Sequence, residues 1–234
     1  MSRWIIPDVH GCAKTLRSLV ESFIKLSKED ELFLLGDYID RGPSSKEVID
    51  YLMDLQAQGY RIHCLKGNHE DYCVQAWEED QHWHLLKPEV QRLWERVGAK
   101  ETFKSFGVKR PREIPQAYID WMRNLEYYHE LEHFILVHAG MNFQAEHPFE
   151  DTHSMTRVRS FKVDFSKTGG RRIIHGHIPV DYSFIDHVIH HQNNYDFIAL
   201  DNGVFCTDQT DMGNLMAFNP DTNVLFAQTN LDQF

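Results

Sequence analysis

Aspartate, histidine and asparagine side chains gather in five short polar clusters along the chain. The clusters are Asp8-Val9-His10-Gly11, residues 36–42 with Asp37, Asp40 and Arg41, Gly67-Asn68-His69-Glu70, His138-Ala139-Gly140 and His175-Gly176-His177. A single aspartate or histidine beside a glycine usually marks a turn, so no cluster indicates a function alone. Together they offer mixed oxygen and nitrogen ligands, which suit Mn, Fe, Zn or Co better than Ca or Mg. The clusters therefore predict a metal site.

Each cluster follows an apolar segment that has the pattern of a buried strand. These segments are residues 4–7, 32–35, 60–65, 134–137 and 173–174. Helical spacing predicts helices over 13–26 and 44–58, the second opened by Pro43 and a capping box of Ser44 with Glu47. This alternating order predicts a parallel sheet, and ligands bind outside the carboxyl ends of such strands. We therefore expect the five loops to converge on one site.

The rest of the chain predicts a helical insertion and a second group of strands. Residues 71–125 have mostly helical patterns with several tryptophans, which we interpret mainly as the core of the insertion. Apolar segments at 197–200 and 215–218, with turns at Asp201-Asn202-Gly203 and Pro220-Asp221, predict an antiparallel meander. Because the clusters between Asp8 and His177 must meet, we expect one domain over residues 1–234.

The composition and charge of the chain argue against some kinds of binding partner. The chain has 234 residues and a formal net charge of −11, which argues against a general affinity for nucleic acid or anionic membranes. No segment approaches the ~20 apolar residues of a membrane span, and the first residues lack an apolar signal core. Four scattered cysteines without a CxxC pair favour reduced thiols. We expect a cytoplasmic protein, and the oligomeric state stays open.

In order and spacing, the clusters resemble the motifs of the calcineurin-like metallophosphoesterases, in particular the PPP-type serine/threonine protein phosphatase branch. Its GDxHG, GDxxDRG, GNHE, HxG and GH motifs correspond to the five clusters, and the likeness extends to about Phe218. One departure is Pro7, which stands where the first motif usually has glycine. The resemblance implies an α/β fold in which a β-sandwich of two mixed sheets is flanked by helices. It also implies two divalent metal ions per chain, for which we favour Mn²⁺ over Fe or Zn.

The resemblance also implies roles for individual residues. Asp8, His10 and Asp37 match the ligands of the first metal; Asp37 would bridge to a second metal completed by Asn68, His138 and His177. His69 matches the general acid, oriented by Asp40, and His175 matches no ligand. Arg41 matches a phosphate-binding arginine, Arg159 is the better match for a second one, with Arg157 as the fallback, and Asn68 would also contact substrate.

These roles describe hydrolysis without a covalent intermediate. Two close divalent ions can acidify a shared water, which would attack phosphorus in line. The arginines would meet charge on the equatorial oxygens, and the His69–Asp40 pair would protonate the leaving group. The expected activity is a serine/threonine protein phosphatase, or a phosphatase of small phosphate esters. The alternative is a symmetrical dinucleoside polyphosphate hydrolase. A catalytically silent metal scaffold and a nucleic-acid phosphodiesterase are less favoured.

Overall fold

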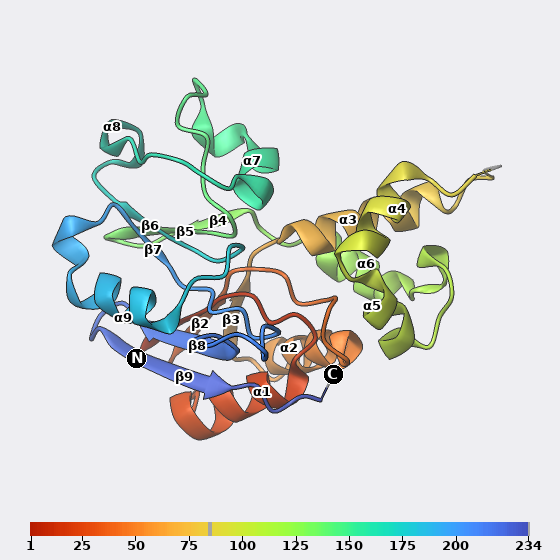
Figure 1. Ribbon diagram of the computed structural model, residues 1–234, viewed down its shortest axis with the longest axis horizontal. Coiled ribbons are helices and arrows are strands. Elements are labelled where there is room, and N and C mark those ends of the chain that lie inside the picture. Colours follow the sequence, from red (N-terminus) through yellow and green to blue (C-terminus); the bar gives the residue numbers. More distant parts are fainter. Residues whose placement is uncertain (84–85, 234) are drawn as a thin grey trace.

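The computed structural model describes residues 1–83 and 86–233. The first sheet contains, in spatial order, β3 (Arg61–Cys64), β2 (Glu31–Leu34), β1 (Arg3–Ile6), β8 (Asn214–Asn219) and β9 (Val224–Thr229). The second contains β4 (Tyr128–Glu130), β5 (Phe134–Val137), β6 (Arg172–His175) and β7 (Phe197–Ala199). Within each sheet, the strands that precede the polar clusters run parallel (Figure 1). The predicted sandwich of two mixed sheets flanked by helices is confirmed.

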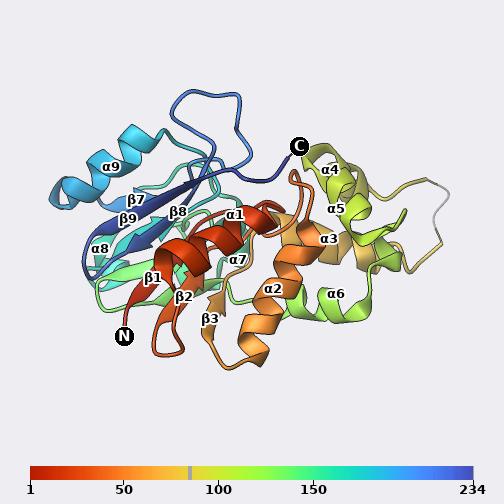
Figure 2. The ribbon, with the colours of Figure 1, turned by 90° about the horizontal axis from the view of Figure 1, so that it is seen from below.

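The alternation of side chains along β1 shows how the layers are held together. Trp4 and Ile6 pack in the core beneath α1 (Ala13–Ser18) and α2 (Ser45–Ala57), whereas Ile5 packs in the core between the sheets. Successive side chains of a strand point to opposite faces, so a central strand needs apolar residues at every position. Figure 2 shows α1 and α2 side by side over the first sheet.

Short helices lie beside the second sheet. The helix α9 (Tyr182–His190) contributes Ile185 and Val188 to the core between the sheets. The segment that carries α7 (Thr152–Arg157) and α8 (Phe165–Thr168) contributes Met155 and Val163 to a core with β5 and β6. No helix in residues 1–83 or 86–233 is long and apolar enough to cross a membrane.

Between β3 and β4 the described chain is mostly helical. It forms α3 (Asn68–Glu79), α4 (Glu89–Val97), α5 (Ala99–Phe106) and α6 (Gln116–Arg123), which project to one side of the sheets (Figure 1). Trp94 is fully buried in the same apolar core as Leu16 and Leu32, whereas Trp83 is 85% exposed. The expectation that the tryptophans fill a core therefore holds for Trp94 and is wrong for Trp83.

The structure corrects two further expectations. β7 pairs in parallel with β6, and only β8 and β9 form an antiparallel hairpin. The predicted meander is wrong because the chain crosses from one sheet to the other after Asp201, where the Asn202 amide donates to the carbonyls of Val180 and Asp211. The predicted capping box is absent as well. Ser44 makes no side-chain cap, and Glu47 accepts a hydrogen bond from Ser105 instead.

Candidate dinuclear metal centre

The five polar clusters meet at the carboxyl ends of β1, β2, β3, β5 and β6. Five residues of these loops have positive backbone φ angles, which are uncommon for residues other than glycine: His10 (44°), Asp37 (52°), Asp40 (72°), Arg41 (67°) and His177 (69°). Such conformations cost on the order of 1–3 kcal/mol each and persist where the surrounding structure enforces them. Their concentration in these loops indicates that the backbone conformation serves to orient the polar side chains toward one site.

Asp8, His10 and Asp37 form the first group of candidate ligands. His10 Nε2 lies 3.8 Å from Asp8 Oδ2 and 3.7 Å from Asp37 Oδ2. The other ring nitrogen, Nδ1, donates to the carbonyl of Ile39 at 3.0 Å, which leaves a lone pair on Nε2. Burial, the largest effect, lowers the pKa of His10 well below its usual value, so the ring is neutral. A neutral imidazole with a free lone pair is the state that a metal ligand requires.

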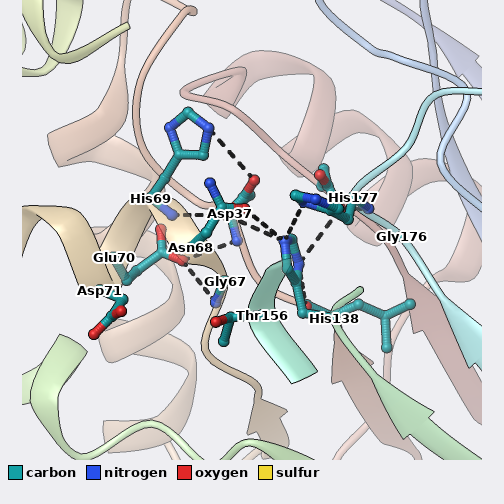
Figure 3. Close-up of polar contacts among 12 residues, drawn as sticks. Asp37, Gly67, Asn68, His69, Glu70, Asp71, His138, Thr156, Gly176 and His177 are labelled. Carbon is teal, nitrogen blue, oxygen red and sulfur yellow. Dashed lines mark hydrogen bonds and ion pairs between the residues drawn. The ribbon is translucent and has the colours of Figure 1, made fainter. Parts of the chain in front are cut away.

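Asn68, His138 and His177 form the second group, and Asp37 lies beside them (Figure 3). His138 Nε2 lies 3.1 Å from Asn68 Oδ1, 3.1 Å from His177 Nδ1 and 3.5 Å from Asp37 Oδ1. His138 Nδ1 donates to the carbonyl of Leu35 at 2.9 Å, so Nε2 carries a lone pair directed at other acceptors. One Asp37 oxygen faces this group and the other faces His10, which is the arrangement expected of a bridging carboxylate.

The residues present fit a pair of divalent cations. Asp8 Oδ2 is buried and has no hydrogen-bond partner among the described residues. Burial opposes ionisation of Asp37, but the surrounding histidines hold its pKa below the usual value. Burial lowers the pKa of His177 to about 3, so this ring is neutral as well. Converging lone pairs and a buried carboxylate oxygen without a donor are what a bound cation would compensate.

Two glycines of the motifs allow the ligands to approach the backbone closely. A Cβ atom on Gly67 would lie 2.0 Å from Asp37 Oδ1, and one on Gly176 would lie 2.3 Å from Asp8 Oδ1. Any side chain at either position would therefore displace a candidate ligand. This explains why the third and fifth clusters have glycine before Asn68 and His177.

His69 and Asp40 form a buried pair beside the first group. His69 Nδ1 lies 2.6 Å from Asp40 Oδ2, and His69 Nε2 lies 3.7 Å from Asp37 Oδ2. Burial lowers the pKa of His69, but Asp37 and Asp40 outweigh it, so that the pKa is raised. His10, Asp37 and His69 are themselves close enough to hold a metal, with ligand atoms within 4.8 Å of one another. Because Asp40 engages Nδ1, we expect His69 to act as a proton donor.

The insertion holds Asp40 in place. Trp94 of α4 donates its Nε1–H to Asp40 Oδ2 at 2.7 Å, and Thr102 of α5 donates its hydroxyl to Asp40 Oδ1. The backbone N–H of Asp40 contacts the hydroxyls of Ser45 and Thr102, each at 3.0 Å. The carboxylate is thus saturated with donors and fully buried.

The three candidate phosphate-binding arginines, Arg41, Arg157 and Arg159, differ in the contacts that their guanidinium groups make. The Arg41 guanidinium lies 4.1 Å from the centre of the Phe205 ring. Arg157 is paired with Asp71 at 2.5 Å, whereas Arg159 is exposed and has no hydrogen bond or ion pair among the described residues. The charge of Arg159 contributes to the low pKa of His177, which places it near the second group. Arg159 therefore remains the better candidate for contacting phosphate.

Three side chains at the site were not assigned a role from the sequence. Glu70 accepts hydrogen bonds from the backbone N–H groups of Asp37, Tyr38, Ile39 and Gly67, and so ties the second and third clusters together. Its position three residues after Gly67, at the start of α3, is a capping-box signal that could have identified it.

The other two lie after β7. Asp201 is buried, and burial raises its pKa to about 7. Its charge is also among the causes that raise the pKa of Asp8. Phe205 packs its ring against His10, with centroids 5.0 Å apart. The sequence shows only a turn at Asp201 and offers no signal for Phe205.

Comparison with known proteins places these features in a family. A model of the calcineurin-like phosphoesterases matches residues 1–206. The symmetrical bis(5'-nucleosyl)-tetraphosphatase of Pseudomonas putida is 30% identical over 145 residues, which cover 60% of this chain and 43% of that protein. The enzyme of the same name from Buchnera aphidicola is 40% identical over 70 residues, covering 30% of this chain and 24% of that protein. The match thus spans less than half the length of these relatives.

Solved structures share the architecture at low identity. A candidate diadenosine tetraphosphatase matches with a TM-score of 0.64 and 16% identity, over 96% of this chain and 91% of that one. A protein serine/threonine phosphatase from Saccharomyces cerevisiae matches with a TM-score of 0.64 and 13% identity, over 100% of this chain and 81% of that one. At these identities the likeness concerns the fold alone. Since the family model covers all five clusters and most of the sequence, the chain belongs to the calcineurin-like phosphoesterases, a family of metal-dependent hydrolases.

Proposed function

We propose that this chain is a symmetrical dinucleoside polyphosphate hydrolase, which cleaves the central phosphoanhydride of its substrate and releases two nucleoside diphosphates. The observation that carries the proposal is the likeness to the symmetrical tetraphosphatases of Pseudomonas putida and Buchnera aphidicola. The serine/threonine phosphatase expected first from the sequence has weaker support, because its match among solved structures is only 13% identical. The alternative reading of the sequence is therefore the better one.

We assign the ligands as the sequence predicted them. Asp8, His10 and Asp37 would hold one divalent cation, and Asn68, His138 and His177 would hold a second that shares Asp37. The unpartnered Asp8 oxygen and the lone pairs around His138 Nε2 support this division. When bound, the two cations would supply Lewis acidity toward phosphate oxygens and an acidified water. Mixed carboxylate, amide and imidazole ligands suit Mn²⁺, Fe or Zn, and Mn²⁺ is our choice among them.

The chain's own residues supply the remaining steps. Arg41 and Arg159 would donate paired N–H groups to the phosphate oxygens, where negative charge develops. His69 would deliver the proton on Nε2 to the leaving oxygen, while Asp40 accepts from Nδ1 and fixes the ring. Trp94 and Thr102 keep Asp40 in position as this proton moves.

A serine/threonine phosphatase remains the second candidate because of one groove. A hollow of about 710 Å³ extends from Arg157 and Tyr72 along α3 and α4, where Glu78 and Glu89 line it. A groove that presents glutamates suits a basic peptide better than a polyanionic nucleotide.

Product analysis separates the candidates. Purified protein would be assayed with Mn²⁺ on diadenosine tetraphosphate and on basic phosphoserine peptides. We expect ADP as the sole nucleotide product, and little peptide dephosphorylation. Release of AMP with ATP would contradict symmetrical cleavage, and turnover of peptides alone would establish the second candidate. Repeating the assay with Fe, Zn and Mg tests the choice of Mn²⁺.

A further inference from the structure

An apolar cavity opens beside the candidate metal centre, at the carboxyl ends of β5, β6 and β7. Its volume is about 280 Å³, near the small end of the range for ligand pockets. Three phenylalanines contribute to the wall, Phe161, Phe184 and Phe197. The buried imidazole of His175 packs against two of them: its ring centroid is 5.3 Å from those of both Phe161 and Phe197, which are 5.6 Å apart. The cavity is thus lined by aromatic rings.

The cavity is connected to the site but does not coincide with it. Ala139 and Ile178 line it, and each is the chain neighbour of a candidate ligand, His138 or His177. Neither ligand itself lines the cavity. Arg159 lines the cavity as well, and its charge acts on His177 of the second ligand group.

We propose that this cavity is the subsite for one nucleobase of the dinucleoside polyphosphate. Flat heteroaromatic rings stack on aromatic side chains irrespective of their hydrogen-bonding edges. A base in the cavity would be linked through its ribose to a phosphate beside Arg159, and the phosphate chain would then continue to the ligand groups. The inference rests on the proposed function and adds the group that recognises the nucleoside.

The placement favours a nucleobase over the phenyl ring of phosphotyrosine. In an aryl phosphate the ring is bonded to the phosphate ester oxygen, so it must lie directly beside the atoms that hold the phosphate. Here the cavity is lined by Ala139 and Ile178, the chain neighbours of two candidate ligands, and by none of the candidate ligands themselves. A nucleobase is set back from its phosphates by the ribose, which matches this separation. The small volume also excludes an extended peptide.

Phe184 is the residue with which to test the subsite. It lies on α9 at the surface and is 37% exposed, so its removal should leave folding intact. Phe165 on α8 is 41% exposed and does not line the cavity, which makes Phe165→Ala a matched control. The substrates are diadenosine tetraphosphate and inorganic tetrapolyphosphate, which has the phosphate chain without rings.

We expect Phe184→Ala to raise KM for diadenosine tetraphosphate about tenfold, the loss typical of one stacked ring, with little change in kcat. KM for tetrapolyphosphate should stay constant, Phe165→Ala should change neither, and Phe184→Trp should restore the wild-type value. Equal effects on both substrates, or none on either, would overturn the subsite.

A binding measurement separates this proposal from the proposed function. Wild-type protein should bind AMP at least about tenfold more tightly than ribose 5-phosphate, and Phe184→Ala should abolish this preference. If that result comes with no hydrolysis of diadenosine tetraphosphate, the subsite stands and the proposed function fails. A preference for O-phosphotyrosine over AMP would assign the cavity to a phenyl ring and refute the subsite.

Discussion

The assignment of His69 as proton donor predicts a loss of activity that depends on the leaving group. In His69→Asn the side chain keeps a similar size but cannot supply the imidazole proton. His69 is buried, with 1% of its surface exposed, so bulk water has little access to replace it. General acid catalysis contributes about 10²–10⁴-fold, and the burial favours the upper part of that range for poor leaving groups. This corresponds to about 3–5 kcal/mol of activation free energy.

The assay compares the variant and wild type on aryl phosphates of graded leaving-group acidity, together with diadenosine tetraphosphate. We expect a full loss on phenyl phosphate and a much smaller one on 2,4-dinitrophenyl phosphate. Diadenosine tetraphosphate should behave like the activated ester, because its leaving group is a phosphate that needs little help from an acid. A plot of log kcat/KM against leaving-group pKa should therefore be steeper for the variant.

Two controls distinguish loss of the proton donor from other effects of the substitution. His63→Asn replaces a histidine outside the site, one that stacks on Phe33 with centroids 4.7 Å apart, and should leave activity unchanged. The metal content of His69→Asn must also be measured, because His69 lies close enough to His10 and Asp37 to serve as a ligand. An equal loss on every substrate, accompanied by loss of bound metal, would refute the proton-donor role and make His69 a ligand.

Three further predictions follow from single contacts. Trp94→Phe removes one charge-assisted hydrogen bond to buried Asp40, so the free energy of unfolding should fall by about 1.5–3 kcal/mol in urea titrations, and an unchanged value would contradict this. Gly67→Ala places a methyl group where it overlaps the carboxylate of Asp37, so titration calorimetry should show that the variant no longer binds two metal ions. Binding of two metal ions would show that the loop can shift to accommodate the methyl group. Burial lowers the pKa of His63, so the unfolded chain binds its proton more readily; this contribution to stability is complete above pH ~6.5 and is lost as pH falls below it. The loss of stability between pH 7.5 and 5.5 should be smaller in His63→Asn, and an equal loss would count against this assignment.

The sequence could locate the candidate ligands because each one lies within four residues after the end of a strand. Local apolar patterns mark the strands, and parallel pairing then brings their carboxyl ends together without further information. Asp8, Asp37 and His138 are of this kind. The order of the strands and the residue types were enough to predict that these side chains converge, whereas their roles as ligands are proposals.

What the sequence could not predict depends on contacts between distant segments. Asp201 looks like a turn residue, and it reaches the site only because the chain crosses between sheets at that point. Nothing in the spacing of Arg157 and Arg159 shows that Asp71 engages the first and leaves the second exposed. The predicted meander failed for the same reason, since two strands close in sequence can belong to different sheets.

The helical insertion supplies hydrogen-bond donors to Asp40, so it contributes to the candidate site itself. The sequence predicts a helical insertion over residues 71–125, next to loops that carry the candidate ligands. In the structure, Trp94 and Thr102 hold the carboxylate that orients His69. Gly98, between α4 and α5, also packs against Arg41, where an added Cβ would lie 3.0 Å from its backbone nitrogen. A substitution that shifts these helices must therefore move both the candidate proton donor and a candidate phosphate-binding arginine. Substitutions in the insertion should then change kcat as well as KM.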